Sequence, residues 1–162
     1  MFFWFIGTAV LSIGVIFRDP HFDYRLLIVG SVIPLGDGLF GGARVLHSVT
    51  VCAGLLAVLM LATGRGRPLR KLVLGLPIGM ILHLVFDGIW NNSEVFWWPF
   101  FGFSFDDAEL PVVEHGMWGI PLEGVGLMIC VWLWRNNTFS DRASRRRFFR
   151  DGELDAVPAR FG

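Results

Sequence analysis

Long apolar segments with almost no charge set the first constraint on this chain. Four of them cover residues 2–17, 45–63, 72–90 and 117–134. The hydrocarbon core of a bilayer is about 30 Å thick, and a helix needs roughly 17 to 25 such residues to cross it. A fifth segment, residues 26–35, is shorter and contains Pro34, so we expect it to cross irregularly or to re-enter the membrane among its neighbours.

The composition indicates the same class of protein. Hydrophobic residues make up 54% of the chain and charged residues only 17%, which is typical of a membrane protein rather than of a soluble domain. We therefore predict an all-α fold, a multi-pass transmembrane helical bundle of four or five spans over residues 1–140. A short cytoplasmic C-terminal tail, residues 141–162, follows and is first basic and then acidic. The formal net charge of zero argues against nucleic acid as a partner.

The charges of the connecting segments predict how the bundle is oriented. Residues 64–71 and the chain after Trp134 are rich in arginine, whereas residues 91–116 contain acidic side chains and no Lys or Arg. Basic connections stay in the cytoplasm, so the first two segments are predicted to lie inside and the third outside. We favour an outer N-terminus with five crossings. In the alternative, the N-terminus is inside and residues 26–35 are re-entrant.

Four ionisable residues interrupt or border the apolar segments: Asp37, His47, His83 and Asp87. Ionisable side chains within a membrane are costly and mark functional sites. His83 and Asp87 are four positions apart, which places both on one face of a helix. The predicted topology brings all four residues into the outer half of the membrane, together with His115.

This set of side chains predicts a metal site. Two imidazoles and two carboxylates suit a divalent metal, with Zn²⁺ favoured and Mn²⁺ possible where more oxygen atoms bind. We predict that Asp37, His47, His83 and Asp87 are the ligands. The simpler interpretation is that His83 and Asp87 hydrogen-bond each other and that His47 joins neighbouring helices.

Glu123 lies inside the last apolar segment and needs a partner at that depth. We predict that it is the catalytic proton-transfer partner, a general base that takes a proton from metal-bound water. Two alternatives are a carboxylate that orients a histidine and an ion pair with Arg25 or Arg44.

A set of short stretches is distinctive: residues 23–27, 33–34, 37–38, 44–48, 76–80, 83–88, 96–99 and 145–152. These stretches resemble a family of bacterial inner-membrane proteins described as metal-dependent hydrolases. The resemblance covers most of the chain after the first apolar segment and implies a divalent metal held by Asp and His residues for hydrolysis of a lipid-like substrate. The family pattern has an acidic residue where Leu35 stands here, and a His-Arg pair where Gly42 and Ala43 stand.

Two other classes of function use the same polar residues. A small ion or proton transporter would line its path with them, although the inner halves of the apolar segments carry few polar side chains. A non-catalytic membrane scaffold would use them for stability and its basic tail for a partner. In each case membrane lipids are the expected surroundings, and a homo-oligomer is compatible with the sequence.

Overall fold

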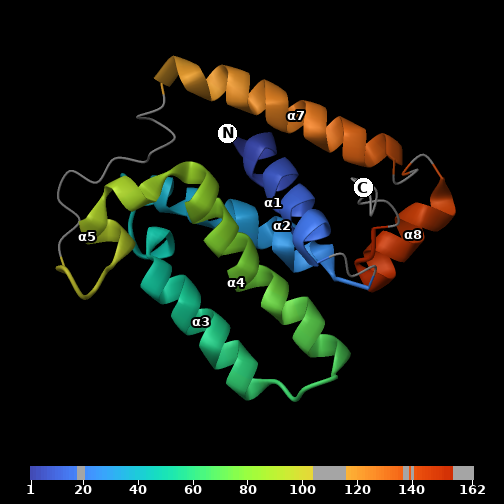
Figure 1. The fold of residues 1–162 in the computed structure, drawn as a ribbon, viewed down its shortest axis with the longest axis horizontal. Coiled ribbons are helices and arrows are strands. Elements are labelled where there is room, and N and C mark those ends of the chain that lie inside the picture. The colour runs from blue at the N-terminus through green and yellow to red at the C-terminus, as the bar shows by residue number, and fades with distance from the viewer. Residues whose placement is uncertain (18–20, 104–115, 137–138, 140, 155–162) are drawn as a thin grey trace.

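The computed structural model describes residues 1–17, 21–103, 116–136, 139 and 141–154. These residues form seven α-helices joined by short 3₁₀ turns, and none of them lies in a strand (Figure 1). The prediction of an all-α fold is confirmed for this part of the chain. The α-helices are α1 (Phe2–Phe17), α2 (Tyr24–Val32), α3 (Val49–Ala62), α4 (Pro68–Asp87), α5 (Ser93–Phe96), α7 (Gly119–Asn136) and α8 (Arg142–Asp151).

Two helical segments are long and apolar enough to cross a membrane. They are α4, with 20 residues, and the 21-residue segment Gly116–Asn136, in which the 3₁₀ turn η4 (Gly116–Trp118) leads into α7. Helices α1 and α3 are apolar but have only 16 and 14 residues, which correspond to about 24 and 21 Å.

Local sequence explains where α3 begins and where α2 ends. Residues 45–47 form the 3₁₀ turn η2 (Val45–His47), and Ser48 then caps α3 by accepting a hydrogen bond from the N–H of Val51. Ser and other small polar residues stabilise such a helix start. The segment 26–35 also divides, because Pro34 lacks an N–H and the chain continues past Val32 as the 3₁₀ helix η1 (Ile33–Phe40).

Helices α2 and α4 lie against each other through glycine. A Cβ atom on Gly30 would overlap the backbone carbonyl of Leu76, and one on Gly79 would overlap the carbonyl of Leu27. Gly75 and Gly79 are four positions apart on α4, the small-xxx-small spacing that lets two helix backbones approach closely. This close approach brings the last turns of α4 to the end of α2.

Helix α7 packs mainly on α1 and lies along one side of the bundle (Figure 1). Gly126 is buried against the backbone of Trp4, where no larger side chain would fit. Only 11% of the α7 span is buried, although the helix is almost wholly apolar. Much of its apolar surface is therefore uncovered in the isolated chain.

Two apolar clusters hold the remaining helices together. The first joins α3, α4 and the turns around α5, and the second joins α1, α2, α7 and the chain beyond α8. The buried members of the first cluster are Ala43, Cys52, Met80, Leu84, Ile89 and Val95, and those of the second are Val10, Ile13, Tyr24, Leu27, Leu133 and Leu154.

Candidate metal centre

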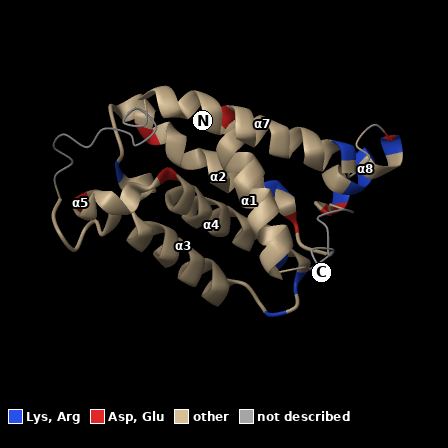
Figure 2. Cartoon of the chain, turned by 45° about the horizontal axis from the view of Figure 1, so that its top comes forward, with Lys and Arg blue, Asp and Glu red and all other residues tan. Residues whose placement is uncertain are grey.

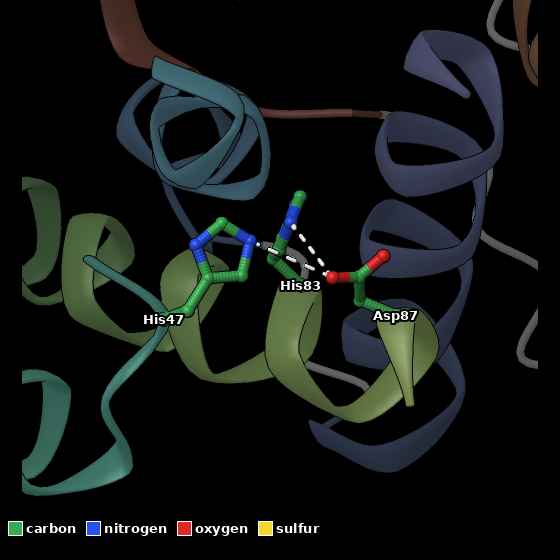
Figure 3. Close-up of side chains that lie close together, drawn as sticks. All are labelled: His47, His83 and Asp87. Carbon is green, nitrogen blue, oxygen red and sulfur yellow. Dashed lines mark ion pairs between the residues drawn. The ribbon is translucent and has the colours of Figure 1, made fainter. Parts of the chain in front are cut away.

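Three side chains from two separate parts of the chain converge inside the bundle. His83 and Asp87 project from the last turns of α4, and His47 ends the turn η2 opposite them (Figure 3). One ligand atom from each residue lies within 4.8 Å of the others. All three residues are buried, with exposures of 0%, 1% and 0% for His47, His83 and Asp87.

The local fold fixes where these residues lie. The four-residue spacing places His83 and Asp87 on one face of α4, as predicted, and the helix then ends at Gly88, which has a φ of 78°. Glycine adopts this left-handed conformation without strain. Ser48 holds the other side of the site, because its hydroxyl donates a hydrogen bond of 2.7 Å to the carbonyl of Trp98.

Asp37 determines the tautomer of His47. One oxygen of Asp37, Oδ2, accepts hydrogen bonds from the backbone N–H groups of Arg44 and Leu46 at 2.9 and 3.0 Å, and lies 3.0 Å from Nδ1 of His47. Because this oxygen acts as an acceptor, Nδ1 is the donor. In the neutral ring, Nε2 is left with its lone pair and lies 3.5 Å from Oδ2 of Asp87.

The backbone carbonyl of Ser31 determines the tautomer of His83. Nδ1 of His83 lies 2.7 Å from this carbonyl oxygen, which can only accept a hydrogen bond, so Nδ1 is the donor. Pro34, three residues later, has no N–H and so cannot compete for this carbonyl. Nε2 of His83 then carries a lone pair and lies 3.9 Å from Oδ2 of Asp87. The ring of Phe5 covers His83, with the ring centroids 3.8 Å apart.

The converging atoms have no hydrogen-bond partner among the described residues. They are Nε2 of His47, Nε2 of His83 and both carboxylate oxygens of Asp87. An unsatisfied buried polar atom costs about 1–3 kcal/mol, and a charged one costs more. Two lone pairs that face a carboxylate would repel it, so this arrangement favours a proton or a cation between the rings and Asp87.

A divalent metal would satisfy the two ring nitrogens and Oδ2 of Asp87. Metal-binding histidines commonly donate their second ring N–H to a carboxylate or a backbone carbonyl, as His47 and His83 do here. Ligand atoms around a tetrahedral Zn²⁺ lie about 3.3 Å apart, because each is about 2.0–2.2 Å from the ion. The separations of 3.5 and 3.9 Å to Oδ2 of Asp87 are slightly wider than this, and the ligand atoms of the two histidines lie within 4.8 Å of each other. The donor set and its spacing therefore fit a metal ion.

The structure brings three of the four predicted ligands together and places Asp37 differently. Asp37 is buried behind His47, and it contacts the ring nitrogen that faces away from the cluster. In this arrangement Asp37 positions a ligand and is not itself one of the converging groups. His115, which the sequence places near the same site, lies outside the described residues.

Glu123 is not one of the converging groups. Its carboxylate accepts hydrogen bonds from the backbone N–H groups of Phe3 and Trp4 at 3.1 and 3.3 Å, and lies 4.0 Å from the N-terminal amine. A carboxylate at this place offsets the partial positive charge at the start of α1. The structure thus gives Glu123 a capping role, and its carboxylate contacts the start of α1 rather than Arg25 or Arg44.

Sequence analysis missed two contributors to the centre. The Ser31 carbonyl is a backbone group and leaves no signal in residue identity, although Pro34 three positions later removes one backbone N–H that could have bonded to it. Phe5 belongs to an apolar helix in which no pattern distinguishes it from its neighbours. No family model, curated protein or solved structure matches this chain, so the site has to be interpreted from its own geometry.

Proposed function

We propose that this chain is a membrane-embedded, metal-dependent hydrolase that acts on a lipid-like substrate. The observation that carries the proposal is the group of buried ligand atoms of His47, His83 and Asp87, which have no other partner among the described residues. Three protein ligands of this kind are the usual set of a catalytic zinc, because they leave a coordination position for water or substrate. Zn²⁺ is the favoured metal, and Mn²⁺ is the second choice.

The membrane placement rests on α4 and α7. The exposed apolar surface of α7 needs a lipid environment, since a soluble protein rarely exposes so large an apolar patch. Trp118 and Trp134 are both more than half exposed and are separated by 16 residues, or about 24 Å along the helix. This spacing suits two aromatic belts at the two surfaces of a bilayer.

The charge distribution supports a cytoplasmic C-terminus in a bacterial inner membrane. Lys and Arg gather on α8 and on the loop between α3 and α4 (Figure 2). Arg25, Lys71 and Arg150 line one pocket, so the starts of α2 and α4 meet the end of α8 at one end of the bundle. His83 lies 15 residues from Pro68, about 22 Å along α4, so the metal centre belongs to the opposite, outer end. The five-crossing topology remains part of this proposal.

The residues have separate roles in the proposed reaction. A metal ion bound by His47, His83 and Asp87 would polarise a phosphoryl or acyl oxygen and supply a nucleophilic water near neutral pH. Asp37 keeps Nε2 of His47 free for this task, and the Ser31 carbonyl does so for His83. The proposal assigns Glu123 no role in the chemistry. The resemblance of the sequence to membrane-bound metal-dependent hydrolases favours the same class of reaction.

Metal content of the purified protein tests the proposal directly. Elemental mass spectrometry should find stoichiometric zinc or manganese in the wild type and little in His83→Ala or Asp87→Ala. The matched control is His21→Ala, because His21 lies on the surface and contacts Glu153 instead of the cluster. A wild type without metal after reconstitution, or a His83→Ala variant that keeps it, would contradict the assignment. Phosphoester and ester lipids would then be tested as substrates with the same variants.

One observation favours a second candidate, a structural metal centre. The three ligand residues are at most 1% exposed, and Phe5 lies over His83. Structural zinc sites are closed, whereas catalytic sites keep an open position. In that case metal removal would lower the unfolding temperature, and no ester or phosphoester lipid would be hydrolysed by the loaded protein. Hydrolysis that is lost in His83→Ala and retained in His21→Ala would exclude a purely structural role.

A further inference from the structure

The helix α8 presents a basic face that the proposed hydrolase chemistry does not use. Its ten residues include five arginines, and the helix is strongly amphipathic. Arg142 and Arg146 are exposed and lie one turn apart on the same face as Phe149, which is 73% exposed. An open groove of about 960 Å³ runs along this side, lined by the arginines and Phe149.

The other face of α8 is attached to the bundle. Phe148 packs against the second apolar cluster and against Phe139, with the ring centroids 5.4 Å apart. The N–H of Tyr24 donates a hydrogen bond of 2.9 Å to the carbonyl of Gly152, just beyond the helix. α8 is therefore a positioned helix whose basic face has a defined direction.

Arg25 fixes the C-terminal end of α8. Its guanidinium donates hydrogen bonds of 2.9 and 3.0 Å to the last carbonyls of the helix, those of Phe149 and Arg150. Asp23 holds the same guanidinium through a contact of 2.6 Å. A cation at this place also offsets the partial negative charge of the helix end. This clamp connects two stretches of sequence more than 120 residues apart.

We propose that the arginine face of α8 binds the phosphate headgroups of anionic lipids in the cytoplasmic leaflet. The inference rests on the membrane placement proposed above and is independent of the metal centre. Only five positions separate Asn136, where α7 ends, from Asp141, which caps α8. A membrane-spanning α7 would thus hold α8 at headgroup level.

Charge and shape favour a lipid surface over other anions. Arginine binds phosphate oxygens through its planar fork of N–H donors. An apolar ring beside the arginines, such as Phe149, can enter the boundary between headgroups and acyl chains. Among the described residues, no hydrogen bond or ion pair holds the side chains of Arg142 and Arg146, so both remain able to bind phosphate.

Lipid titration of the full-length protein in a neutral detergent tests the inference. Native mass spectrometry would measure the affinity for dioleoylphosphatidylglycerol and for dioleoylphosphatidylcholine. The variant is Arg142→Gln with Arg146→Gln, and the matched control is Arg65→Gln with Arg67→Gln. The control removes the same charge from the exposed loop before α4, at the same end of the bundle.

The expected loss of phosphatidylglycerol affinity is about fivefold for each arginine removed from α8, with no change for phosphatidylcholine. The loop variant should bind like the wild type, and high salt should weaken the binding of the wild type. The inference would be overturned if the two variants lost equal affinity for phosphatidylglycerol, or if the α8 variant kept the affinity of the wild type. Tighter binding of a short DNA duplex than of phosphatidylglycerol would also overturn it. Circular dichroism of each variant checks that the helices are retained. Metal content, which should not change, separates this outcome from a failure of the hydrolase proposal.

Discussion

Asp37→Asn should weaken metal binding without unfolding the protein. The native carboxylate accepts three hydrogen bonds through one oxygen, two of them from backbone N–H groups and one from His47. An amide oxygen can keep these contacts but loses the negative charge, and hydrogen bonds to charged groups are the stronger by about 1 kcal/mol. His47 then becomes a weaker ligand and is held less firmly. Substitution of such an outer partner lowers metal affinity by about 10- to 100-fold.

Asp37→Ala should have a larger and different effect. It leaves the N–H groups of Arg44 and Leu46 and the ring N–H of His47 without their acceptor. Each unsatisfied buried donor costs about 1–3 kcal/mol, so the alanine variant should be several kcal/mol less stable even without metal. The asparagine variant therefore separates the effect on the metal from the effect on the fold.

Competition with a fluorescent zinc chelator would measure the affinity of the wild type and of Asp37→Asn. The matched control is Glu123→Gln, because Glu123 also accepts hydrogen bonds from two backbone N–H groups but lies outside the cluster. Its zinc affinity should equal that of the wild type. Equal affinities for all three proteins would refute the positioning role of Asp37, and an equal loss in both variants would show that the effect is not local to His47.

Three further predictions concern packing and the metal. Gly30→Ala would place a Cβ atom against the Leu76 carbonyl and should lower the free energy of unfolding by about 1–3 kcal/mol. Gly54→Ala, with open space around it, should instead stabilise α3 by about 0.5–1 kcal/mol. Similar unfolding temperatures for the two variants would contradict the close α2–α4 contact. Phe5→Ala should destabilise the protein by about 3–5 kcal/mol and speed metal loss to a chelator, since the ring covers His83; an unchanged rate would show that metal leaves by another route. Chelation should lower the unfolding temperature of the wild type but not that of His83→Ala, and a similar drop in both would point to an effect unrelated to this centre.

Local sequence was sufficient to predict the relative placement of His83 and Asp87, two of the three converging residues. The four-residue spacing of His83 and Asp87 predicts a shared helix face wherever the helix forms, and α4 confirms it. The start of α3 was less predictable. Val45 continues the apolar pattern, yet Ser48 competes as a helix cap and leaves residues 45–47 as a separate turn. An apolar pattern gives the extent of a hydrophobic segment but not the point at which its backbone becomes helical.

Long-range contacts decided the roles of the remaining carboxylates. Asp37 and Glu123 are both acidic residues in apolar surroundings, and both were predicted to act at the metal. The structure places Asp37 against the outer nitrogen of His47 and Glu123 at the start of α1. Which backbone or side-chain donor a carboxylate meets depends on residues ten and 120 positions away. Residue type alone therefore could not distinguish a metal ligand from a positioning group or a helix cap.

The helical class, the apolar segments and the basic end of the molecule can be predicted from the sequence, because they follow from composition and from periodicity along the chain. Which nitrogen of each histidine is free cannot be predicted in this way and depends on how the helices pack. That choice depends on the contact of His83 with the Ser31 carbonyl and of His47 with Asp37. The first contact requires α2 and α4 to approach at Gly30 and Gly79, and such an approach is a property of two packed surfaces rather than of either segment alone.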